Sequence, residues 1–172
     1  MSKEPRPTPY TTVCVSGGFD PVHIGHLRMI QQASEYGHVV VIVNSDDWLM
    51  RKKGYIFMPF DERCEILEGF TATGETTNVD DRDGTVCEAL RRIKPDYFAN
   101  GGDRKINNTP EMDVCEELGI EMLWGVGGGK IQSSSTLVTD AGMDPGPMAE
   151  GDLKPSKVEI LASGDIAKIG NY

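Results

Sequence analysis

Short apolar runs recur along the chain, and the segments between them carry apolar residues at helical spacing. The run within 11–16 contains Val13-Cys14-Val15 and is followed by glycine, which is typical of a short buried strand. The run Val39 to Val43 is continuous and almost entirely β-branched, which indicates a parallel strand covered on both faces. Weaker runs predict three further strands, at 76–79, 96–100 and 120–124.

The intervening segments predict helices. Leu27, Ile30 and Ala33 fall on one helical face, with polar residues on the other. The serines at 133–135 precede an apolar pair, and serine is a favoured N-cap residue, so another helix would begin there. We interpret the basic segment 51–54 as a loop. Further helices are predicted at 59–70, 84–93 and 110–118.

This alternation of strands and helices predicts a doubly wound, parallel, five-stranded α/β sheet of the Rossmann-like kind. Residues 11–140 would form that domain. Three prolines within residues 1–10 favour an extended N-terminal arm. Residues 141–172 form a Gly- and Pro-rich extension, in which 158–169 could be a hairpin.

Composition narrows the class of protein. A chain of 172 residues with 38% hydrophobic and 26% charged residues is typical of one soluble globular domain. The net charge of −10 argues against nucleic acid or an anionic membrane as a partner. The four cysteines are far apart and form no C-x-x-C pair, so we expect reduced thiols and no zinc site. No apolar run approaches the ~20 residues that span a bilayer, and no signal-peptide pattern is seen, so we expect a cytoplasmic protein.

A glycine turn after the first strand carries two histidines. Gly17 and Gly18 allow a sharp turn and a close approach to a ligand, and a helix start favours an anion. His23 and His26 are three residues apart at that helix start, so both rings would point the same way and offer N–H donors to phosphoryl oxygens. The alternative is that His23 caps the helix and His26 merely packs.

Other polar segments are expected at the same edge of the sheet. They are the lysines Lys52 and Lys53, the segment Gly101 to Asp103, and the serines 133–135. Each has an alternative: a solvated turn for the cations, an ordinary turn for the glycines, and a plain linker for the serines. Arg63, early in its helix, could reach the phosphates or could form a surface pair with Asp61 or Glu62.

The turn and its histidines resemble a known signature. The tetrad His-Ile-Gly-His at 23–26, after a G-x-F-D turn, looks like that of the nucleotidyltransferase superfamily, which includes cytidylyltransferases and several adenylyltransferases. The resemblance runs from about Thr11 to Val138. The segments 43–46, 61–63 and 101–103 look most like the heptose-phosphate adenylyltransferase and glycerol-phosphate cytidylyltransferase branch. Class I aminoacyl-tRNA synthetases share the tetrad but need a larger chain and a K-M-S-K-S segment, which is not found here.

The resemblance implies roles for individual residues. His23 and His26, with Lys52 or Lys53, would be catalytic, and Arg63 and Lys130 would contact the substrate. Arg104 stands where relatives often have an aromatic residue, and Gln132 replaces an apolar one. The residues expected to bind the nucleotide are Gly17, Gly18, Phe19, Asp20, Gly25, Gly101, Gly102, Asp103, Arg104, Ser133, Ser134 and Ser135.

The expected reaction is transfer of a nucleoside monophosphate to a phosphorylated small molecule, with release of pyrophosphate. A substrate phosphate would attack the α-phosphorus of the triphosphate, and Mg²⁺ would bridge the phosphates, held partly by water, with no dedicated metal site in the protein. The segment matches favour ATP with a sugar phosphate over CTP with a polyol phosphate. The resemblance also implies a homodimer. Two other classes remain open: a non-catalytic nucleotide-binding regulatory module, and an assembly protein without nucleotide affinity.

Overall fold

The computed structural model describes residues 11–101, 109–129 and 132–142, and it confirms the α/β fold. Within these residues five parallel strands form one sheet in the order β3-β2-β1-β4-β5. The chain therefore winds outward from β1 in both directions. In such sheets ligands bind at the carboxyl edge, where the winding reverses, which here lies between β1 and β4. The strands are β1 (Thr12–Gly17), β2 (His38–Val43), β3 (Glu75–Thr77), β4 (Tyr97–Gly101) and β5 (Glu121–Val126).

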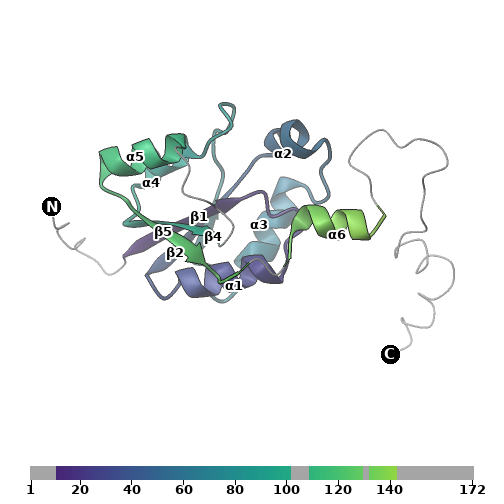
Figure 1. Cartoon of the computed structure of the whole chain (residues 1–172), viewed down its shortest axis with the longest axis horizontal. Coiled ribbons are helices and arrows are strands. Elements are labelled where there is room, and N and C mark those ends of the chain that lie inside the picture. The colour runs from purple at the N-terminus through teal and green to yellow at the C-terminus, as the bar shows by residue number, and fades with distance from the viewer. Residues whose placement is uncertain (1–10, 102–108, 130–131, 143–172) are drawn as a thin grey trace.

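Helices cover both faces of the sheet. Figure 1 shows α4 and α5 on one face and α1 on the other. No helix in the described part of the chain is long and apolar enough to cross a membrane. The helices are α1 (Ile24–Ala33), α2 (Asp46–Lys53), α3 (Phe60–Glu68), α4 (Cys87–Ile93), α5 (Pro110–Leu118) and α6 (Ser134–Asp140).

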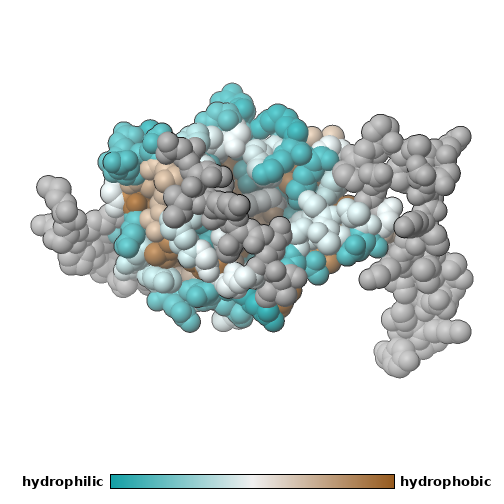
Figure 2. Space-filling model, viewed as in Figure 1, coloured by the Kyte–Doolittle hydropathy of each residue, from teal (hydrophilic) through white to brown (hydrophobic). Residues whose placement is uncertain are grey.

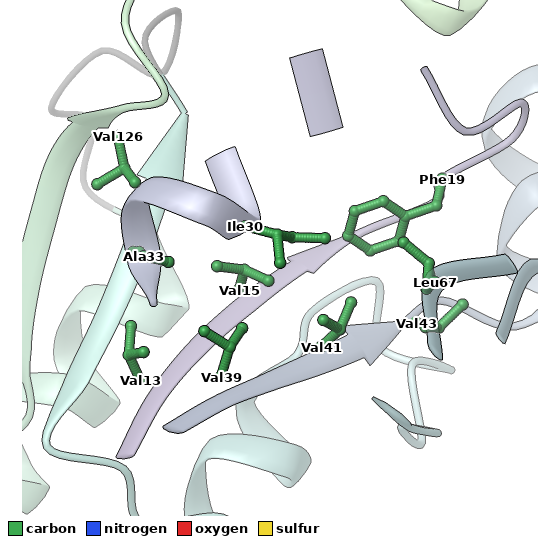
Figure 3. Close-up of a cluster of buried hydrophobic side chains, with 11 residues drawn as sticks. Val13, Val15, Phe19, Ile30, Ala33, Val39, Val41, Val43, Leu67 and Val126 are labelled. Atoms are coloured by element: carbon green, nitrogen blue, oxygen red, sulfur yellow. The ribbon is translucent and has the colours of Figure 1, made fainter. Parts of the chain in front are cut away.

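Two apolar clusters hold the layers together. Figure 3 shows Ile30 and Ala33 of α1 against valines of β1 and β2, with Phe19 and Leu67 at one end of the cluster. On the opposite face, Leu90 of α4 and Val114 of α5 pack against Cys14 and Ile42. The continuous valine run of β2 is buried on both faces, as its sequence predicted.

The basic segment 51–54 is not a loop. Arg51, Lys52 and Lys53 form the last turn of α2, and Gly54 ends the helix at φ 81°. Ser45 caps the start by accepting the Trp48 N–H at 3.0 Å. Acidic residues in the first turn and basic ones in the last turn suit the helix dipole, so the sequence contained the signals of this helix.

Smaller differences concern element ends. α3 ends at Glu68, so Phe70 lies beyond it, and α4 begins at Cys87 instead of at residue 84. The arm at 1–10 and residues 143–172, including the predicted hairpin, lie outside the described residues.

Candidate active site

A cavity of about 510 Å³ opens at the carboxyl edge of the sheet. It is lined from β1, β4 and β5, from Asn44 just after β2, from the helices α1, α2, α5 and α6, and from the turn before α4. Every segment that was expected to meet at this edge therefore contributes to one hollow. The predicted residues that line it are Gly17, Gly18, Phe19, His23, Gly25, His26, Lys52, Lys53, Gly101, Ser133, Ser134 and Ser135.

His23 and His26 stack at the start of α1, with ring centroids 3.7 Å apart. His23 is the N-cap residue, and its Nδ1 accepts the Gly25 N–H at 3.0 Å. The Nδ1 atom of His26 accepts the His23 N–H at 3.2 Å, which completes a capping box. Because Nδ1 is an acceptor in both rings, the proton of each neutral imidazole is on Nε2.

The environment keeps His26 neutral. Burial, the neighbouring His23 and the charge of Lys53 lower the pKa of His26 from 6.5 to about 3. The ring also packs edge-on against Phe19, with centroids 4.8 Å apart. The capping and packing that we raised as an alternative are thus present, and both rings still line the cavity. His26 is therefore a neutral N–H donor at pH 7.

Gly25 is required by this stacking. A Cβ at position 25 would lie 2.9 Å from Cε1 of His23, so any side chain there would displace the ring. The middle glycine of the tetrad thus keeps the histidine pair in place.

The serine segment begins α6 and meets the histidine turn. The hydroxyl of Ser133 caps α6 by accepting the Thr136 N–H at 3.0 Å. The Ser134 hydroxyl donates to the carbonyl oxygen of Pro21 at 2.8 Å, across 113 residues of sequence. The alternative of a plain serine-rich linker is therefore wrong.

The two lysines enter the cavity from the end of α2. The Nζ atom of Lys52 lies 4.5 Å from the centroid of the Trp48 ring. Lys53 Nζ lies 3.4 Å from the backbone oxygen of Asp20. Burial lowers the pKa of Lys53; Asp20 opposes that shift, and the charges of Lys52 and Arg63 add to it. Both cations thus line the cavity that contains the histidine pair, and the charge of Lys53 acts on His26.

Two predicted site residues have structural positions instead. The carboxylate of Asp20 is fully buried and accepts the N–H groups of Phe57 and Met58, so it does not line the cavity. Arg63 is also fully buried, so its predicted substrate contact is wrong. The predicted alternative, a surface pair with Asp61 or Glu62, is wrong as well.

The buried guanidinium of Arg63 joins three segments. It donates to the carbonyl oxygens of Gly18, Asn44 and Met58 at 2.6, 2.8 and 2.9 Å. It also forms an ion pair with Asp46 at 2.7 Å. Arg63 therefore fixes the ends of β1 and β2, from which the cavity is built. No periodic pattern marks such a residue, because it is a charged group in the core.

Other predicted residues cannot be placed. Gly102, Asp103, Arg104 and Lys130 lie outside the described residues, so their roles stay predictions.

The cavity wall also contains residues that the sequence prediction of the site did not include, among them Asn44, Trp48, Asn100 and Glu111. Asn44 and Asn100 are buried at the ends of apolar runs, and that position at a strand's carboxyl end is a signal that could have identified them. Glu111 looks like an ordinary first-turn acid of α5, and nothing in its sequence context marks it.

The chain is similar in sequence to several known proteins. The model of the family described as cytidylyltransferase-like matches residues 14–126. The FAD synthase of Thermococcus kodakarensis is 34% identical over 113 residues, which cover 64% of this chain and 70% of that one. The bifunctional protein HldE of Nitratiruptor sp. is 31% identical over 109 residues, 62% of this chain but only 23% of that larger protein.

Solved structures share the fold at low identity. The lipopolysaccharide core biosynthesis protein of Thermoplasma volcanium has a TM-score of 0.56 at 22% identity, over 67% of this chain and 94% of that one. A putative nicotinate-nucleotide adenylyltransferase of Vibrio parahaemolyticus has a TM-score of 0.53 at 17% identity, over 87% and 96% of the two chains.

Proposed function

Since this chain belongs to the cytidylyltransferase-like family, we propose that it transfers a nucleoside monophosphate from ATP or CTP to a phosphorylated small molecule and releases pyrophosphate. The acceptor would be a sugar phosphate, a polyol phosphate or another small phosphate ester. The homodimer and the cytoplasmic location expected from sequence stay predictions.

One observation carries the proposal: the serine segment is bonded to the histidine turn. The hydrogen bond from Ser134 to Pro21 holds the start of α6 against the loop that leads into His23. The imidazole N–H donors and the serine segment consequently line one cavity, and preorganised N–H donors stabilise a triphosphate.

The proposed reaction needs no covalent protein nucleophile. A phosphate oxygen of the acceptor attacks the α-phosphorus, and the bond from that phosphorus to the pyrophosphate oxygen breaks. His23 and His26 donate from Nε2 to the transferring and leaving phosphates, and Lys52 or Lys53 holds the attacking phosphate. The serines 133–135 bind the outer phosphates. Catalysis then comes from alignment and charge stabilisation.

Mg²⁺ enters this proposal with the nucleotide. Within the described residues no cluster of three or more His, Cys, Asp or Glu side chains could hold a metal ion. Triphosphate oxygens and water would therefore supply most of its ligands, as is usual for this ion. Its contribution when bound is to neutralise the charge of the phosphates.

The relatives favour ATP as the donor. FAD contains an AMP group, so a relative named FAD synthase makes an adenylylated product. This agrees with the segment matches, which favour ATP with a sugar phosphate over CTP with a polyol phosphate. FMN accordingly joins the sugar and polyol phosphates as a candidate acceptor.

A pyrophosphate-release assay tests the proposal. ATP and CTP are each offered with phosphorylated sugars, phosphorylated polyols, phosphopantetheine and FMN, and the expected result is release that depends on one acceptor. Binding of triphosphate without release for any acceptor would favour the non-catalytic module. Absence of nucleotide binding would favour an assembly protein.

A further inference from the structure

Glu111 places a buried carboxylate in the wall of the cavity. It lies in the first turn of α5 and is 6% exposed. Its Oε1 accepts the N–H of Val86, the residue before α4, at 3.3 Å. For Oε2, no hydrogen bond is found among the described residues. One carboxylate oxygen is thus used to join two helix starts, and the other is available to a ligand.

The surroundings of Glu111 differ from the rest of the cavity. Lys52 and Lys53 line the cavity from the end of α2, whereas Glu111 comes from the α4 and α5 side, which Figure 1 shows on one face of the sheet. Near it in the wall are Val86 and Gly84, and neither has a charged side chain. Of the cavity residues that the structure describes, the lysines are the cations and Glu111 is the acid.

The charges of the cavity therefore favour different parts of a substrate at its two ends, phosphates near the lysines and uncharged groups near Glu111. A buried carboxylate repels phosphate strongly, because little water screens it. Burial also deprives the carboxylate of hydration, and a hydrogen bond donated by a ligand would offset that loss of free energy. The group that suits this end is an uncharged one that carries hydroxyl or amino donors.

We infer that Glu111 forms a subsite for the hydroxyl- or amino-bearing, non-phosphate part of a substrate. This inference rests on the proposed function and names which part of the substrate lies at the α5 end. Two sources supply such groups: the nucleoside of the triphosphate, and the sugar, polyol or ribityl body of the acceptor. Either group would donate a hydrogen bond to Oε2 and would be oriented by it, while the phosphates of the same molecule lie toward the lysines and histidines.

The variant Glu111→Gln tests the subsite with little change of shape. The amide oxygen still accepts the Val86 N–H, while the NH₂ group replaces the oxygen available to a ligand, so an acceptor becomes a donor. Glu116→Gln, an exposed acid on the same helix, is the matched control for the lost charge. Thermal unfolding of both variants checks that the fold is kept.

Binding of ATP, CTP and inorganic tripolyphosphate is measured by calorimetry on the full chain, and the acceptor KM is taken from the pyrophosphate assay. If the nucleoside occupies the subsite, Glu111→Gln weakens ATP or CTP binding about ten- to a hundredfold and leaves tripolyphosphate within about twofold. If the acceptor occupies it, nucleotide binding is unchanged and the acceptor KM rises by that factor. Glu116→Gln changes neither.

Two results overturn the inference: no change beyond the control in any of these quantities, or an equal loss for ATP and tripolyphosphate. A wild-type chain that releases no pyrophosphate fails the proposed function instead. In that case the subsite is tested by comparing how Glu111→Gln changes the binding of ATP and of tripolyphosphate. If the wild-type chain binds none of the three probes, both the proposed function and the subsite inference are wrong.

Discussion

Each histidine of the pair uses its two ring nitrogens differently. The Nδ1 atoms of His23 and His26 accept backbone N–H groups and stabilise the start of α1. The Nε2 atoms carry the protons of the two neutral rings and are therefore their donors. Any substitution that removes the whole ring of His26 therefore mixes a capping effect with a chemical one, and the two must be separated by experiment.

Two variants of His26 separate these effects. His26→Ala removes both nitrogens, whereas glutamine is the residue that completes a capping box at this position and keeps an acceptor for the His23 N–H. We expect both variants to lose about 10²- to 10³-fold in turnover, as for other preorganised donors. His26→Gln is expected to recover most of the unfolding free energy that His26→Ala loses, about 1 kcal/mol. Turnover and urea unfolding measure the two; near-normal turnover by His26→Ala would remove this residue from the mechanism.

The low pKa of His26 makes stability depend on pH. In the folded protein this pKa is lowered from 6.5 to about 3, so only the unfolded chain takes up the proton below pH 6.5. The stabilising contribution is full above pH 6.5 and falls as the pH decreases toward 3. At pH 5 the loss is roughly 2 kcal/mol. Urea unfolding of wild type and His26→Gln between pH 7.5 and 5 checks this; parallel curves would contradict the neutral assignment.

For single residues, the sequence predicted a place at the cavity correctly where the residues belong to a short local motif. The glycines, the histidines and the serines 133–135 stand in short segments with a recognisable chemistry, and all of their described members line the cavity. Asp20 and Arg63 stand in the same segments and are buried structural groups. Local pattern does not tell a ligand-facing charge from one that serves backbone groups, because that depends on contacts made by distant residues.

At the scale of elements, α2 shows how a chemical interpretation can hide a structural one. Three consecutive basic residues suggested a loop, yet they complete a helix that Ser45 begins and Gly54 ends. The carboxylate of Asp81, after β3, accepts from the Ser45 N–H at 2.8 Å and from its hydroxyl at 2.7 Å. This anchor fixes the start of α2, so the helix delivers Lys52 and Lys53 to the cavity.

Arg63 has the same role between β1, β2 and the entry to α3. Replacing it by methionine leaves the Gly18 and Asn44 carbonyl oxygens and the Asp46 carboxylate without their donors, so we expect a loss of about 3–5 kcal/mol in unfolding free energy. Arg82→Met removes an exposed pair with Asp80 and should cost only a small fraction of that. Urea unfolding compares the two variants. Equal small losses would show that the buried network contributes nothing beyond a surface pair.

For the molecule as a whole, the predicted topology located the site more fully than any single motif did. Parallel strands bring their carboxyl ends to one edge, so loops far apart in sequence had to meet there. The net charge of −10 is compatible with a phosphate ligand because the cavity has its own cations. Figure 2 shows hydrophilic residues over α2 and over the outer side of α5, which agrees with a water-facing surface there. The buried acid at position 111 could not be predicted, because only the packing of α5 against α4 places it.

Because the cavity joins residues from Gly17 to Ser135, a triphosphate should stabilise the entire domain. A ligand that binds only the folded state at about 100 times its Kd adds ~2.7 kcal/mol, which for a chain of this size raises Tm by roughly 5–10 °C. Thermal unfolding with and without tripolyphosphate measures the shift, and KCl of equal ionic strength controls for screening of the acidic surface. Replacing His23 and Ser134 by alanine together should abolish most of the shift, because the change removes an imidazole donor and the hydrogen bond from Ser134 to Pro21 that joins the two sides of the cavity. An equal rise with KCl, or an undiminished rise in the double variant, would show that phosphate does not bind between these segments.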